Sequence, residues 1–122
     1  MVKSIIGIAY DCSNASKLAD FYVAITGWEK EFATDEWAGI RTPHGILLVF
    51  QTVKDYQAPT WPWEDDKPQQ QAHIDFYVDD LDEAVELAIR HGAKKASTQY
   101  FDTSTVMIDP EGHPFCLSTV DQ

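Results

Sequence analysis

Basic residues are scarce in this 122-residue chain, and their scarcity argues against several kinds of partner. The chain has 9 lysine and arginine residues against 20 aspartate and glutamate residues, which gives a formal net charge of −11 at pH 7. Nucleic acids and anionic membranes are bound largely by neutralising their phosphates with cationic side chains. We therefore expect neither partner. The acidity either attracts a cationic ligand or simply keeps the protein in solution.

Cysteine and long hydrophobic runs are also scarce. The two cysteines, Cys12 and Cys116, are too few for a disulfide-dense secreted scaffold, so we expect two reduced thiols. No segment reaches the apolar length of a membrane-spanning helix. Residues 1–10 have one lysine and a short mixed run, typical of a first strand rather than of a signal peptide. These features predict a cytoplasmic protein.

What the chain does contain is one order of elements that occurs twice. Hydrophobic residues make up 44% and charged residues 24%, a composition typical of a single globular domain, which we place over residues 1–122. Each half shows an extended apolar run, an amphipathic helix and three short strands. Repeat one covers about 1–52, a connecting loop covers 53–72, and repeat two covers about 73–122.

Both predicted helices have start and stop signals. The first helix spans about 13–26 and the second about 81–91, each with apolar residues at helical spacing. The apolar positions are Leu18, Phe21, Tyr22 and Ile25 in the first helix and Leu81, Ala84, Val85, Ala88 and Ile89 in the second. The capping residues are Ser13 or Asn14 with Gly27 for the first helix, and Asp80, Glu83 and Gly92 for the second.

Matching turns join the last two strands of each repeat. Their sequences are Thr-Pro-His-Gly at 42–45 and Asp-Pro-Glu-Gly at 109–112, and proline at the second position with glycine at the fourth favours a type I turn. We expect strands near 28–34, 37–42 and 45–52 in repeat one and near 94–101, 104–108 and 114–120 in repeat two. The fold class is therefore α+β, with two βαβββ repeats forming a curved, cup-like mixed sheet and the helices on the outside.

Alternation along the strands predicts which side chains face away from the helices. On the strand that begins at His73, this face carries His73, Asp75 and Tyr77, and on the last strand it carries Cys116. With Ser4 aligned to His73, repeat one contributes Ser4, Ile6, Ile8, Leu47, Val49 and Gln51 to the same face. A face that combines bulky apolar side chains with polar ones is typical of a sheltered ligand site.

The connecting loop 53–72 is rich in proline and contains Trp61 and Trp63. It is too short and too aromatic to be a flexible linker between separate domains. Three interpretations stay open: a connector whose tryptophans cover the edge of the core, a lid over the ligand site, or a dimer contact.

The two βαβββ units, the Asp-Pro-Glu-Gly turn at 109–112 and the aromatic pair Phe21-Tyr22 together resemble the vicinal oxygen chelate superfamily, which includes glyoxalases, bleomycin-resistance proteins and extradiol dioxygenases. The resemblance covers nearly the whole chain. It is closest to small glyoxalase-like proteins of unassigned activity. The features shared with these are Asp11-Cys12 before the first helix, Pro68-Gln69-Gln70 before His73, and the cysteine in the last strand.

In the metal-dependent members of this superfamily, four strand positions hold a divalent metal. The resemblance places these positions at Ser4, Val49, His73 and Cys116. Of these, His73 is a usual ligand, whereas Val49 has no donor atom and Ser4 is a weak ligand. Cys116 stands where the family uses glutamate. Because a metal needs at least three good protein ligands held together, we expect no catalytic metal; the alternative donor set is His73, Asp75 and Cys116.

The sequence thus predicts a small-molecule-binding protein. The resemblance implies a function like that of the bleomycin-resistance members, which lack the metal ligands and bind a cationic aromatic drug in an acidic, aromatic-lined groove; the tryptophans and the net charge fit such a ligand. The expected ligand-binding residues are Ser4, Trp37, Gln51, His73, Asp75, Tyr77 and Cys116. The alternative is a lyase, isomerase or dioxygenase acting on a small oxygenated substrate, with a metal or with His73 as an acid–base group. The resemblance also implies a homodimer.

Overall fold

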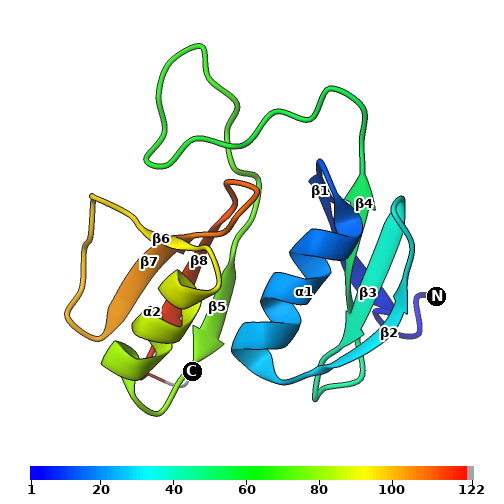
Figure 1. Ribbon diagram of the computed structural model, residues 1–122, viewed down its shortest axis with the longest axis horizontal. Helices are drawn as coiled ribbons and strands as arrows, with labels where there is room; N and C mark the ends of the chain where they lie inside the picture. The colour runs from blue at the N-terminus through cyan, green and yellow to red at the C-terminus, as the bar shows by residue number, and fades with distance from the viewer. Residues whose placement is uncertain (121–122) are drawn as a thin grey trace. The chain divides into compact units, whose positions relative to one another are not determined.

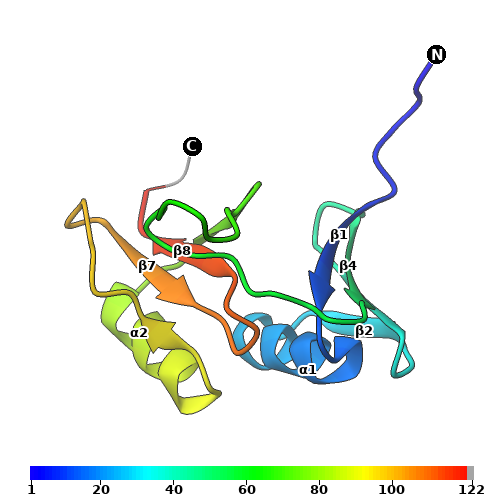
Figure 2. The ribbon, with the colours of Figure 1, turned by 90° about the horizontal axis from the view of Figure 1, so that it is seen from above.

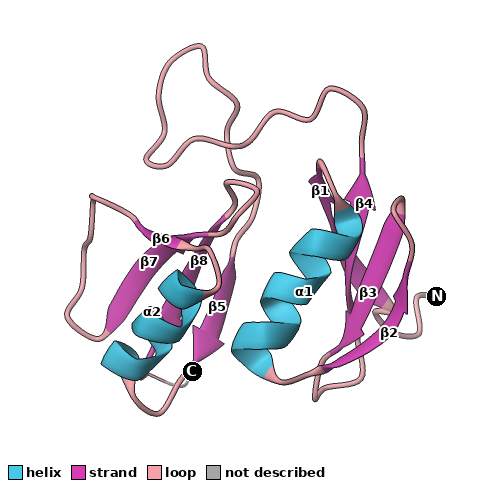
Figure 3. Cartoon of the chain, viewed as in Figure 1, coloured by secondary structure: helices cyan, strands magenta, loops and turns pink. Residues whose placement is uncertain are grey.

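The computed structural model describes residues 1–120, and it confirms the repeated βαβββ order. The chain folds into two compact units, a first unit of Met1–Tyr56 and a second unit that begins at Gln57. Each unit holds one helix and one four-stranded mixed sheet (Figures 1 and 3). The fold class is therefore α+β, as predicted. In the described part of the chain, neither helix has the length and hydropathy needed to cross a membrane.

The first unit contains the sheet with strand order β1-β4-β3-β2. Its elements are β1 (Gly7–Cys12), α1 (Ala15–Thr26), β2 (Glu29–Ala33), β3 (Trp37–Arg41) and β4 (Leu47–Thr52). β1 and β4 pair in parallel, whereas β4–β3 and β3–β2 are antiparallel. Along the chain, α1 lies in the connection from β1 to β4, since parallel strands need a long crossover connection.

Helix α1 forms where the caps and the apolar spacing predict it. The Asn14 side chain accepts a hydrogen bond from the Lys17 backbone N–H at 3.0 Å, and the helix ends at Gly27. Tyr22 is 3% exposed, and its ring stacks on that of Phe50 from β4 with centroids 5.4 Å apart. Figure 2 shows α1 along one face of the sheet. The other face of this sheet is therefore free of the helix.

The second unit repeats the plan with strand order β5-β8-β7-β6. Its elements are β5 (Ile74–Tyr77), α2 (Leu81–Arg90), β6 (Lys94–Lys95), β7 (Ser104–Ile108) and β8 (Pro114–Ser118). Asp80 caps α2 by accepting from the Glu83 N–H at 3.0 Å, as predicted. Of the predicted apolar face, Ala88 is fully buried, whereas Ile89 is 49% exposed and the prediction is wrong there.

Both predicted proline turns form. Gly45 and Gly112 donate their N–H groups to the carbonyls three residues earlier, at 3.1 and 2.9 Å, and both have a φ near +90° (89° and 93°) that favours glycine. In the second turn the Asp109 carboxylate is 4% exposed and accepts from the N–H groups of Glu111 and His113, at 2.8 and 3.0 Å. These hydrogen bonds fix the conformation of the turn that joins β7 to β8.

The strand predicted near 94–101 is much shorter than expected. β6 ends at Lys95, because the Gln99 side chain takes over the pairing with β7. Its amide oxygen accepts from the Val106 N–H at 2.7 Å, and its amide nitrogen donates to the Ala96 and Val106 carbonyls, each at 2.8 Å. A side-chain amide has the same donor and acceptor groups as a backbone peptide, so it can end a strand without leaving its neighbour unpaired.

The predicted alignment of the two first strands is also wrong. Ser4 lies before β1, and the residue that corresponds to His73 is Gly7: each precedes the N-cap of the following helix, Asn14 or Asp80, by the same number of residues. Ile8 pairs with Leu48, so Ile6 and Ile8 belong to the face that carries Leu48 and Phe50, not to the face that matches His73. The sequence alignment erred because both strand starts are apolar and extended, and only the helix caps set the register.

We predict that Gln99→Ala lowers the free energy of unfolding by about 1–3 kcal/mol, because the Val106 N–H loses its partner in a buried strand. Urea denaturation measures the change. Gln71→Ala, at an exposed glutamine, is the matched control and should leave stability nearly unchanged. Equal stability of the Gln99 variant and the parent chain would contradict this account of the short β6.

Candidate functional site

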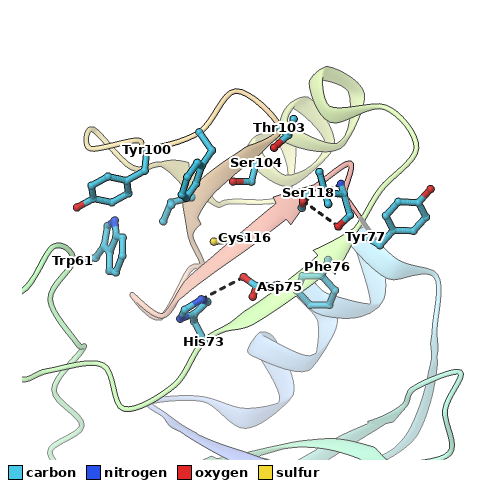
Figure 4. A pocket seen from close by; sticks show the side chains of 13 residues that line it. Trp61, His73, Asp75, Phe76, Tyr77, Tyr100, Thr103, Ser104, Cys116 and Ser118 are labelled. Atoms are coloured by element: carbon cyan, nitrogen blue, oxygen red, sulfur yellow. Dashed lines mark hydrogen bonds and ion pairs between the residues drawn. The ribbon is translucent and has the colours of Figure 1, made fainter. Parts of the chain in front are cut away.

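A pocket with a volume of about 550 Å³ lies in the second unit. Asp75 of β5 and Cys116 of β8 face this pocket. Phe115 and Leu117, the neighbours of Cys116 on β8, are buried on the other side of the sheet, where α2 packs. The lining residues are Trp61, His73, Asp75, Phe76, Tyr77, Tyr100, Phe101, Thr103, Ser104, Val106, Cys116, Ser118 and Val120 (Figure 4). The predicted alternation of β5 and β8 is confirmed by this division.

The strand register arranges the floor of the pocket in rows. In the first row, Asp75 of β5 is opposite Cys116 of β8, which is opposite Val106 of β7. In the next row, Tyr77, Ser118 and Ser104 are opposite one another in the same way. Residues directly opposite on neighbouring strands share a face, so each row crosses all three strands.

Asp75 and Cys116 of the first row form a connected polar group with His73. The His73 Nε2 atom lies 3.3 Å from Asp75 Oδ1 (Figure 4), and the ligand atoms of His73, Asp75 and Cys116 all lie within 4.8 Å of one another. Burial raises the pKa of the Cys116 thiol from 9.0 to about 11, with further contributions from a hydrogen bond to Asp75 and from the charge of that carboxylate. The thiol is therefore protonated at neutral pH and is a poor nucleophile.

The connecting loop contributes one of its tryptophans to the pocket. Trp61 meets Tyr100 edge to face, with ring centroids 6.1 Å apart and an interplanar angle of 88°. Its Nε1 atom is buried and has no hydrogen-bond partner among the described residues. The loop is held by a bridge between Thr60 and Gln69, whereas Trp63 is 61% exposed. Trp61 thus forms part of the pocket wall, whereas the connector, lid and dimer-contact interpretations of this loop stay predictions.

The predicted ligand-binding residues fall into two groups. His73, Asp75, Tyr77 and Cys116 line the pocket of the second unit together. Ser4, Trp37 and Gln51 belong to the first unit. There Trp37 is opposite Gln51 in the β3–β4 pairing, the Gln51 amide donates to Asp11 Oδ1 at 2.6 Å, and Ser4 is exposed ahead of β1.

Sequence reasoning missed the wall built from the segment between β6 and β7 and from β7 itself. Tyr100 and Phe101 are 59% and 74% exposed, and they were assigned to a strand that does not form there. The sequence did contain a signal for Ser104 and Val106. They alternate along the strand next to β8, so both share the face of Cys116.

Comparison with known proteins decides the family. The glyoxalase-like domain family matches residues 7–118. The chain belongs to this family. It is thereby a member of the vicinal oxygen chelate superfamily, as the sequence resemblance predicted. No curated protein matches the chain significantly.

Solved structures of the superfamily share the fold at low sequence identity. A glyoxalase/bleomycin resistance protein/dioxygenase family enzyme from Burkholderia phytofirmans PsJN superposes with a TM-score of 0.70 at 15% identity, covering 94% of this chain and 97% of that one. A glyoxalase-related enzyme from Fulvimarina pelagi gives 0.71 at 14% identity, with 96% and 88% covered. A mutant of the fosfomycin resistance protein FosX from Listeria monocytogenes, complexed with Mn(II) and 1S,2S-dihydroxypropylphosphonic acid, gives 0.72 at 14% identity, with 99% and 93% covered.

The four metal positions of the superfamily do not fit this chain. With the register of β1 corrected, the first position falls on Gly7, where a Cβ atom would lie 2.9 Å from the Leu47 carbonyl oxygen, so no donor side chain can stand there without a shift. Val49 at the second position is a hydrocarbon. Of these four positions, His73 and Cys116 in the second unit carry donor atoms, and Asp75 lies beside them.

We predict that Asp75→Asn speeds alkylation of Cys116 by iodoacetamide at neutral pH. A pKa of about 11 keeps the thiolate fraction roughly a hundredfold below that of an ordinary cysteine. Removing the carboxylate lowers this pKa, although burial still raises it. Mass spectrometry of the Cys116 peptide across a range of pH gives the rate.

Asp65→Asn, at an exposed carboxylate of the connecting loop, is the matched control and should not change the rate. An unchanged rate in Asp75→Asn would show that this carboxylate does not hold the thiol proton.

Proposed function

We propose that the chain binds a small cationic aromatic molecule in the pocket of the second unit and needs no catalytic metal to do so. The observation that carries this proposal is the combination of an exposed carboxylate with aromatic walls in one pocket. Pockets of this volume commonly hold a single small organic ligand.

The charge of the pocket favours a cation over an anion. The Asp75 side chain is 67% exposed, and no lysine or arginine is among the described lining residues. A phosphonate such as the one in the FosX complex has no lysine or arginine to pair with among the described lining residues. An ammonium group beside Asp75 would instead gain both a charge pair and cation–π contact with neighbouring rings.

The polar contacts on the pocket floor support binding without a metal. His73 and the Cys116 thiol both interact with the Asp75 carboxylate, so these three side chains satisfy one another. The first unit has no donor at either of its two family positions, Gly7 and Val49. A ligand can therefore be held by the carboxylate and the rings alone.

The test compares 1-naphthylmethylamine with 1-naphthoate, which place opposite charges on the same ring system. We predict that the amine raises the melting temperature and binds by calorimetry, and that the carboxylate does neither. Asp75→Asn should weaken the amine by about tenfold, because it removes the charge from the pocket. Asp65→Asn should leave its affinity unchanged. Equal binding of the two probes, or no binding of either, would contradict the proposal.

A second candidate function is a metal-dependent enzyme, which the close approach of three donor atoms in the second unit favours. His73, Asp75 and Cys116 as thiolate would hold zinc, since three protein ligands with an open position are typical of catalytic zinc sites. The metal would supply a Lewis acid for a substrate oxygen. Elemental analysis of protein purified without added metal distinguishes the two functions.

We predict less than stoichiometric metal in that preparation, and no change in the metal content of His73→Ala. One zinc per chain in the parent protein, lost in His73→Ala, would show that the pocket is a metal centre and that the metal-free proposal is wrong.

A further inference from the structure

We infer that the ligand carries a hydrogen-bonding tail, such as a hydroxyl or carbonyl group, which binds at the Ser104 end of the pocket. This inference rests on the proposed function. It adds the orientation of the ligand in the pocket and the chemistry of the ligand's tail. It derives from the position of the Ser104 hydroxyl, which has no partner among the described residues and lies in the row next to that of Asp75 on the same sheet face.

The two ends of the pocket differ in chemistry. Figure 4 shows Trp61 and Tyr100 at one end, on the side of His73, and Thr103, Ser104 and Ser118 toward the other, with Cys116 between them. The first end offers the rings of Trp61 and Tyr100, and the second offers several hydroxyl groups, with Tyr77 in the same row as Ser118 and Ser104. A ligand with one aromatic and one polar end therefore has one favoured orientation.

The register sets the spacing between the cation position and the hydroxyl end. Asp75 belongs to the first row and Ser104 to the second, and rows are two residues apart along the strands. Two residues of a strand span about 7 Å, and the two strand spacings from β5 to β7 add about 10 Å across the sheet, so the Asp75 and Ser104 backbones lie about 12 Å apart. A tail of roughly three carbons ending in a hydroxyl spans about 5 Å and, with a hydrogen bond of about 3 Å at each end, covers most of this distance.

The hydroxyl groups at this end differ in whether they already have a hydrogen-bond partner within the protein. The Ser118 hydroxyl accepts from the Val120 N–H at 3.1 Å and lies 3.4 Å from the Val120 carbonyl. The hydroxyls of Ser104 and Thr103 have no partner among the described residues, and Ser104 is half-buried. A half-buried hydroxyl without a protein partner binds either water or a ligand group, so it can select for a polar tail.

The experiment uses two probes of equal length, N-butyl-1-naphthylmethylamine and N-(3-hydroxypropyl)-1-naphthylmethylamine, which differ in a terminal methyl or hydroxyl group. Calorimetry measures both against the parent chain and against Ser104→Ala. We expect Ser104→Ala to weaken the hydroxypropyl probe about fivefold more than the butyl probe, the size of one hydrogen bond. Ser97→Ala, at an exposed serine outside the pocket, should affect neither probe.

The outcomes separate this inference from the proposed function. If the butyl probe binds and Ser104→Ala changes both affinities equally, the tail site is wrong and the aromatic cation site stands. If neither probe binds the parent chain, the proposed function fails and the tail site fails with it. Far-ultraviolet circular dichroism of Ser104→Ala checks that the variant is folded. We expect a native spectrum, because the Ser104 side chain makes no contact that the fold needs.

Discussion

The register of β5, β8 and β7 is the constraint on which the pocket depends. Phe115 and Leu117, which are 0% and 3% exposed, hold β8 with its apolar side toward α2. A slip of one residue would turn every side chain of the strand to the opposite face. Cys116 and Ser118 would then leave the pocket. Burial of Phe115 and Leu117 thus fixes the positions of Cys116 between them and of Ser118 beside them.

Duplication of the backbone has not duplicated the chemistry. The pair Asp75–Cys116 in the second unit corresponds to the pair Ala9–Val49 in the first, in the same parallel register. At the neighbouring position His73 corresponds to Gly7, where the β4 backbone approaches too closely for a side chain. At the four positions that the superfamily uses for a metal, donor side chains are therefore confined here to the second repeat.

The connecting loop shows how a segment without regular structure acquires a role through packing. A Cβ atom at Gly112 would lie 2.5 Å from the Ala58 Cβ, so only glycine allows the loop to approach the β7–β8 turn this closely. Thr60 is tied back to Pro68 by a backbone hydrogen bond of 2.9 Å. Directly after Thr60 the chain places Trp61 against Tyr100, which gives the pocket its aromatic end.

By itself the sequence determined the order of elements, the helix caps at Ser13 or Asn14 and at Asp80, the two proline turns and the alternation of β5 and β8, because each is a local pattern of side-chain chemistry and backbone conformation. It also found the donors on that face, His73, Asp75 and Cys116. Only the tertiary structure decided that β1 pairs with β4 from Gly7 onward, that Gln99 ends β6, and that Trp61, Tyr100 and Ser104 complete the pocket. These features depend on contacts between residues far apart in the chain, and no local pattern encodes such contacts.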